Sequence, residues 1–114
     1  MSLTALQRSQ GALVAALAAD ALGSQFEFCP QAELLRKPFS ELTTLVDCGP
    51  WHTLAGQPTE DGELILLVAR MLVYHGSYAV QPAQQAYHYW LSTDPFAINA
   101  NTQQAFSSGP LPQD

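Results

Sequence analysis

The chain has 114 residues, which is the size of a single domain. Apolar residues make up 47% of the sequence and charged residues only 12%, a composition that argues against intrinsic disorder. The formal net charge of -6 argues against binding to a nucleic-acid backbone and favours a site that recruits a cation. We therefore predict one helical domain over residues 1–114, with no nucleic-acid partner.

The first predicted helix covers residues 4–22, and Gly23 is expected to end it. Its apolar side chains fall on nearly every face, so we expect this helix to be buried. Asp20 lies within this apolar segment and must have a hydrogen-bonding partner, because an unpaired buried charge is costly. We expect Asp20 to brace the loop that carries Thr59, with direct contact to a metal or substrate as the alternative. A short helix then follows and ends before Pro38.

A loop rich in glycine and proline is predicted over residues 43–58. The next helix, over residues 60–74, is the clearest one, and Gly76 is placed to end it. Its apolar face has helical spacing and comprises Leu64, Leu67, Val68, Met71 and Leu72. Two further helices are predicted, over residues 82–91 and 99–107. Because no segment alternates with period two, the fold class is all-α, a helical bundle.

The two cysteines, Cys29 and Cys48, have neither the spacing of a zinc site nor the density of a disulfide scaffold. We expect both to be reduced, with a disulfide as the alternative. The stretch "GALVAALAADALG" has some features of a signal peptide, but Asp20 interrupts it and few basic residues precede it. It is also too short to span a membrane. We predict a cytoplasmic protein without a membrane partner.

The segment "GQPTEDGELILLVARML", residues 56–72, places three acids at the start of a helix. One interpretation is local, because Thr59 is a good N-cap residue and acids in the first turn interact favourably with the helix dipole. The alternative is a metal site. A hydroxyl and two adjacent carboxylates, Glu60 and Asp61, are the hard oxygen ligands that Mg²⁺ accepts.

Several segments, taken in order, resemble the ADP-ribosylglycohydrolase family, which includes the dinitrogenase reductase-activating glycohydrolases. "QGALVAALAADALGSQFEF" resembles the family's opening helix, in which a Gly-Asp-Ala-Leu-Gly segment is followed by an acid, here Glu27. "GQPTEDGELILLVARML" is similar to the Gly-x-x-Thr-Asp-Asp-Thr motif. "HGSY", the aromatic helix around Trp90, and "INANTQQAF" are similar to the segments that follow. The resemblance extends over nearly the whole chain, which matches the N-terminal third of a typical family member.

The resemblance implies an all-α fold and hydrolysis of the glycosidic bond between ADP-ribose and a modified protein side chain. It also implies a pair of Mg²⁺ or Mn²⁺ ions as cofactors, and ADP-ribosylated protein or ADP-ribose as partners. The residues that match the family's ligands are Thr59, Glu60, Asp61 and Glu27. By the same resemblance, Asp61 and Glu60 have catalytic roles, and Asn99 and Asn101 contact the substrate.

The sequence departs from the family pattern in two ways. Glu60 replaces the first Asp of the motif and Gly62 replaces the second Thr, and no Asp-x-Asp-Thr motif occurs near the end of the chain. Part of the metal shell is therefore not encoded in this sequence, and we expect the chain to be inactive alone. The alternative to a Mg²⁺ or Mn²⁺ cofactor is that the chain binds no metal. A different function also fits, that of a non-catalytic helical module that forms homo-oligomers or binds another protein.

Overall fold

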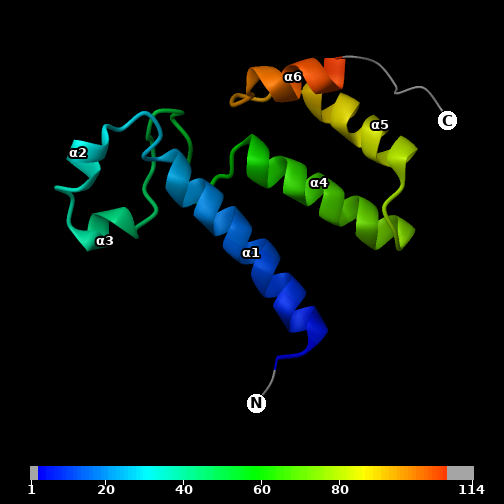
Figure 1. Ribbon diagram of the computed structural model, residues 1–114, viewed down its shortest axis with the longest axis horizontal. Coiled ribbons are helices and arrows are strands. Elements are labelled where there is room, and N and C mark those ends of the chain that lie inside the picture. The colour runs from blue at the N-terminus through cyan, green and yellow to red at the C-terminus, as the bar shows by residue number, and fades with distance from the viewer. Residues whose placement is uncertain (1–2, 108–114) are drawn as a thin grey trace. The chain divides into compact units, whose positions relative to one another are not determined.

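The computed structural model describes residues 3–107, which form six α-helices joined by loops (Figure 1). Among these residues, the one β-type pairing is an isolated bridge between Cys48 and Thr53. The predicted all-α class is confirmed. The helices are α1 (Ala5–Ser24), α2 (Gln31–Leu34), α3 (Phe39–Leu42), α4 (Glu60–His75), α5 (Val80–Leu91) and α6 (Ala100–Ser107).

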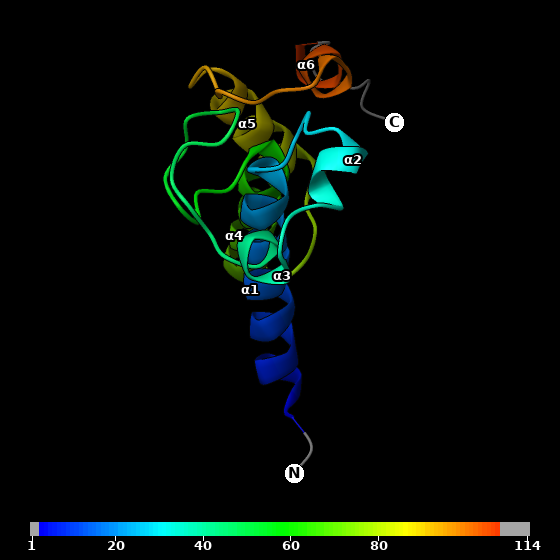
Figure 2. The same ribbon diagram turned by 90° about the vertical axis from the view of Figure 1, so that its left-hand side faces the viewer.

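The chain divides into two compact units, of which the first ends at Gly62 and the second begins at Glu63. The boundary falls in the first turn of α4, so the start of that helix belongs to the first unit. Figure 2 follows the same helices from the side. Within residues 3–107, no helix is both long enough and apolar enough to cross a bilayer.

Helix α1 begins with a capping box and continues past the predicted stop. The amide of Gln7 donates to the Thr4 hydroxyl at 3.2 Å, and the Thr4 amide donates to the Gln7 side chain at 2.9 Å. Gly23 lies inside the helix, which ends at Ser24, so the expected stop at Gly23 was wrong. The expected burial was also wrong for most of α1, because its buried residues are Ala21 and Ser24.

The segment after α1 contains two single-turn helices where one was predicted. α2 lies before Pro38, as expected, but α3 follows it directly. Pro30 and Pro38 precede α2 and α3, with φ of -59° and -65°. Proline suits this position because its ring fixes φ near -65° and because the amide it lacks would have no partner at a helix start. Four residues are too few for a helical period, so sequence periodicity could not reveal α3.

In the second unit, aromatic side chains pack α6 against α5. The rings of Tyr87 and Phe106 are stacked, with centroids 4.6 Å apart, and Trp90 meets Phe106 edge-on at 6.1 Å. The indole N–H of Trp90, which is buried, donates to Glu63 Oε2 at 2.6 Å. Burial raises the pKa of the Tyr87 hydroxyl, and the nearby Tyr78 raises it further. These contacts give this unit its aromatic core.

The ends of the helices in the second unit lie close to the predicted positions. Gly76 has a φ of 71°, and its amide donates to the carbonyl of Leu72 at 2.8 Å, so it ends α4 as predicted. α5 begins two residues before the predicted start at Pro82, which lies in its first turn. α6 begins at Ala100, one residue after the predicted start.

Candidate cation site at the start of α4

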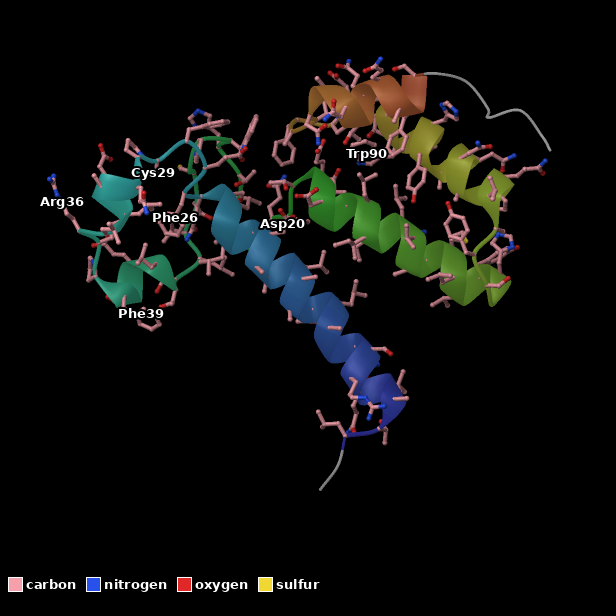
Figure 3. All side chains as sticks on the ribbon, viewed as in Figure 1. Asp20, Phe26, Cys29, Arg36, Phe39 and Trp90 are labelled. Carbon is pink, nitrogen blue, oxygen red and sulfur yellow. The ribbon has the colours of Figure 1, made fainter. Side chains whose placement is uncertain are left out.

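The carboxylate of Asp20, near the C-terminal end of α1, holds the start of α4 (Figure 3). Its Oδ2 accepts hydrogen bonds from the amides of Thr59 at 2.7 Å and Gly62 at 3.1 Å. Its Oδ1 accepts from the hydroxyl of Thr59 at 2.5 Å. The prediction that Asp20 braces the loop carrying Thr59 is confirmed.

One of these bonds takes an amide of the first turn of α4, that of Gly62. Thr59 precedes α4, and its hydroxyl donates to Asp20. The Gly62 amide, a typical target of a cap, is satisfied by Asp20 from another helix. Because the hydroxyl proton of Thr59 points to a carboxylate, the lone pairs of its oxygen can face a cation.

Gly62 is required by the close approach of Asp20. A Cβ placed on Gly62 would lie 2.6 Å from Asp20 Oδ2, 2.6 Å from the Cβ of Pro58 and 3.1 Å from Cδ2 of Leu17. A side chain at this position would therefore displace the carboxylate or the loop. The departure from the threonine of the family motif thus has a steric reason in this chain.

The two adjacent acids of the motif have different environments. Glu60 is buried, with 8% of its surface exposed, whereas Asp61 is exposed. Successive residues of an α-helix point about 100° apart, so neighbouring side chains cannot share one direction. Of these two adjacent acids, Asp61 is the one exposed to solvent.

The fourth predicted ligand, Glu27, lies in the turn after α1 and is also exposed. Its Oε2 accepts a hydrogen bond from the indole N–H of Trp51 at 2.5 Å. The sequence offered no signal for this contact, because Trp51 lies in an irregular loop 24 residues away.

The two predicted substrate contacts lie in the second unit. The side-chain oxygen of Asn99 accepts a hydrogen bond from the amide of Thr102 at 2.9 Å, which is an N-cap bond for α6. Asn101 is exposed in the first turn of that helix. The N-cap bond gives Asn99 a structural role that requires no bound substrate. A role of Asn99 or Asn101 in binding substrate stays a prediction.

The residues at the start of α4 fit a hard cation in their chemistry. Thr59 offers a hydroxyl oxygen, and Asp61 and Glu27 offer carboxylates, which Mg²⁺ and Mn²⁺ prefer over sulfur ligands. Within residues 3–107, no three His, Cys, Asp or Glu side chains come together in a group that could hold a metal. The ligand roles of Thr59, Glu60, Asp61 and Glu27 therefore stay a prediction.

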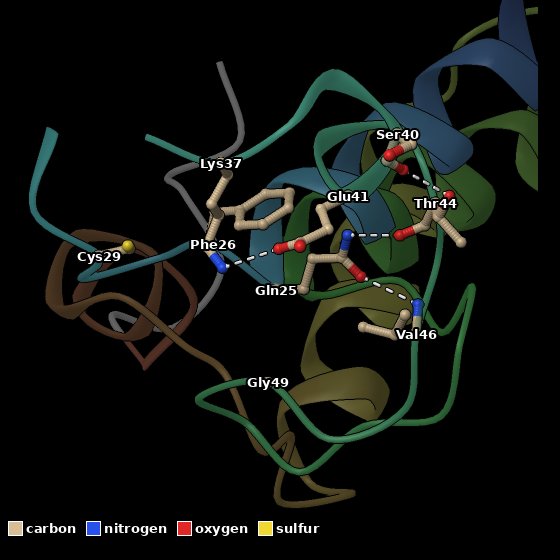
Figure 4. A pocket seen from close by; sticks show the side chains of 9 residues that line it. All are labelled: Gln25, Phe26, Cys29, Lys37, Ser40, Glu41, Thr44, Val46 and Gly49. Atoms are coloured by element: carbon tan, nitrogen blue, oxygen red, sulfur yellow. Dashed lines mark hydrogen bonds and ion pairs between the residues drawn. The ribbon is translucent and has the colours of Figure 1, made fainter. Parts of the chain in front are cut away.

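A separate cavity of about 590 Å³ lies beside the turn that follows α1 (Figure 4). The side chain of Gln25 forms part of its wall, donating to the carbonyl of Thr44 at 2.9 Å and accepting from the amide of Val46 at 3.1 Å. Lys37 and Glu41 form an ion pair at 3.3 Å beside it. None of the predicted site residues lines this cavity.

The sequence matches the family model of the ADP-ribosylglycohydrolases over residues 1–112. The chain belongs to this family. It is also 31% identical, over 103 residues, to a protein of Acanthamoeba polyphaga mimivirus with the provisional name ADP-ribosyl glycohydrolase. That match covers 88% of this chain and 31% of the relative.

Membership of the ADP-ribosylglycohydrolase family agrees with the resemblance seen in the sequence. The chain spans less than a third of the length of its curated relative.

We expect Asp20→Asn to loosen the start of α4. The substitution removes the charge and places an amide group where Oδ1 or Oδ2 now accepts a bond, at a cost of about 2 to 4 kcal/mol. Amide hydrogen exchange should show faster exchange at Thr59 and Gly62, with little change in α6. Asp61→Asn is the matched control, and equal protection in Asp20→Asn and the native protein would contradict the assigned role.

We expect Gly62→Ala to destabilise the first unit by about 1 to 2 kcal/mol, although alanine usually favours a helix over glycine by about 0.5 to 1 kcal/mol. Gly11, in α1, is the matched control, because nothing lies within 4 Å of a Cβ placed there. Urea denaturation should show Gly11→Ala to be neutral or stabilising. A stabilising Gly62→Ala would show that Asp20 does not need this space.

Proposed function

We propose that this chain supplies part of a Mg²⁺- or Mn²⁺-dependent site for ADP-ribosylglycohydrolase chemistry. The reaction is hydrolysis of the glycosidic bond between ADP-ribose and a modified protein side chain. The proposal is supported mainly by the arrangement at the start of α4, where Asp20 orients the hydroxyl of Thr59 beside the exposed Asp61. Family membership supports the class of reaction.

In this proposal the ligands of the cation are Thr59, Glu60, Asp61 and Glu27, of which Thr59 and Glu60 are buried. Bound Mg²⁺ or Mn²⁺ would orient the ribose hydroxyls and lower the pKa of a bound water. Asp20 keeps the Thr59 hydroxyl proton turned away from the cation by accepting it as a hydrogen bond. Asp61 and Glu60 are the candidate catalytic carboxylates, and Asn99 and Asn101 are the candidate substrate contacts.

The remaining ligands would come from residues outside 3–107, in the same or another polypeptide. Acids and hydroxyls from one segment rarely complete the octahedral shell that Mg²⁺ requires. We therefore expect the chain by itself to bind Mg²⁺ weakly and to release little or no ADP-ribose from modified protein.

Isothermal titration calorimetry with Mg²⁺ in the presence of ADP-ribose tests the proposal. Asp61→Asn should abolish the heat of binding, because it removes the exposed carboxylate of the motif. Glu33→Gln, which changes an exposed acid in α2, should leave the heat unchanged. Heat that is the same in Asp61→Asn and in the native protein would remove Asp61 from the site.

A second candidate function is self-association, which the exposed apolar surface of α1 favours. Leu6 and Val14 expose 66% and 65% of their surface, and residues 9–19 contain no charged side chain. Two copies could therefore bring these helices together without charge repulsion, despite the net charge of -6.

Multi-angle light scattering tests self-association. We expect a mass above that of the 12.4 kDa monomer at micromolar concentrations. Val14→Lys should return the protein to a monomer by placing a charge in the contact. A monomeric mass for the native chain over the whole concentration range would rule out this function.

A further inference from the structure

A hydrogen bond between the carboxylate of Glu27 and the indole of Trp51 connects the turn after α1 to the loop before α4. The indole N–H donates to Oε2 at 2.5 Å, a charge-assisted hydrogen bond. Among residues 3–107, no hydrogen bond to the other oxygen, Oε1, is formed. The indole therefore engages one side of an exposed carboxylate and leaves the other available.

Several contacts hold this loop in place. The ring of Trp51 packs against that of Phe28 with centroids 5.8 Å apart. Gly49, with a φ of 60°, lies against the backbone of Gln25, where a Cβ would come within 3.1 Å of its Cα. Cys48 and Thr53 pair across the loop through two backbone hydrogen bonds, of 2.8 and 3.0 Å. The indole is therefore presented to Glu27 by a fixed backbone.

The residues beside both partners have an uncommon backbone conformation. Phe28, next to Glu27, has a φ of 64°, and His52, next to Trp51, has a φ of 54°. Non-glycine residues adopt positive φ infrequently, and such conformations persist where surrounding contacts hold them. Both ends of the Trp51–Glu27 contact are thus built on constrained turns.

We propose that Trp51 is a positioning residue for Glu27. This inference rests on the proposed function, in which Glu27 is a ligand of Mg²⁺ or Mn²⁺. By donating to Oε2, the indole fixes the rotamer of Glu27 and presents Oε1 as a single-oxygen ligand. Hydrogen bonds to a metal-binding carboxylate orient it in this way, and their loss weakens metal binding about 10- to 100-fold.

The side-chain N–H signals of the two tryptophans provide a test that does not require activity. The chain contains two tryptophans, and each donates to a carboxylate, Trp51 to Glu27 and Trp90 to Glu63. Trp90 therefore serves as an internal control in a protein labelled with ¹⁵N at tryptophan. Trp51→Phe and Trp90→Phe assign the two indole signals.

In the ligand-free protein, Glu27→Ala should shift the Trp51 indole signal upfield and leave that of Trp90 in place. Glu33→Ala, the control, should shift neither signal. Absence of a shift in Glu27→Ala would show that the hydrogen bond does not persist in solution, and the inference would fail whether or not a cation binds.

Titration with Mg²⁺ completes the test. We expect the Trp51 signal to move with Mg²⁺ concentration while that of Trp90 stays, and Trp51→Phe to bind Mg²⁺ about tenfold more weakly by calorimetry. Trp51→Phe keeps an aromatic ring against Phe28, so its thermal midpoint should stay close to that of the native protein. Weaker Mg²⁺ binding at an unchanged thermal midpoint would therefore reflect a loss of positioning and not a loss of folding.

Two other outcomes are distinguishable. If the native protein binds Mg²⁺ with an affinity that depends on Asp61 but not on Trp51, the positioning role is wrong and the proposed function stands. If the native protein binds no Mg²⁺, both the positioning role and the cation site are wrong.

Discussion

The carboxylate of Asp20 is the group on which the rest of the candidate site depends. A charged side chain within an apolar helix requires partners, and Asp20 finds three in the backbone and side chain that begin α4. Because the charge is satisfied by amides at a helix start, it stabilises that start at the same time. One residue thus explains the local geometry of Thr59, the need for Gly62 and the contact between α1 and the first turn of α4.

The loop between α3 and α4 is held by a second set of contacts, around the turn after α1. Gln25 binds the backbone at both Thr44 and Val46, and Trp51 binds Glu27. A loop of this length would lose much conformational entropy on ordering, so its contacts must offset that cost. The same contacts place the predicted ligand Glu27 within a defined turn, although the loop itself has almost no regular structure.

Within residues 3–107, the acids do not gather into a group of three that could hold a metal. The chain belongs to the ADP-ribosylglycohydrolases, yet it spans only 31% of the length of its curated relative. Apolar side chains on α1, such as Val14, are exposed. Self-association would cover them, and it does not exclude a cation site at the start of α4.

Sequence patterns determined the all-α class, the bounds of α4 to within a residue or two, and the partnership of Asp20 with the loop at Thr59. Helical spacing and a glycine at a helix end are local patterns that can be recognised in the sequence. The partnership of Asp20 could be expected because an unpaired charge in an apolar helix is costly. The single-turn helix α3 was not predicted, because four residues are too few to show a helical period of apolar side chains. The continuation of α1 through Gly23 shows that glycine permits a helix end without imposing one.

Only the tertiary structure decided which oxygens face which way. The opposite exposures of Glu60 and Asp61, the steric need for Gly62 and the bond from Trp51 to Glu27 all depend on segments that meet through folding. A hydrogen bond acts over about 3 Å in space, whatever the separation along the chain. The sequence therefore indicated which residue types could hold a cation, while their orientation was set by contacts that no local pattern encodes.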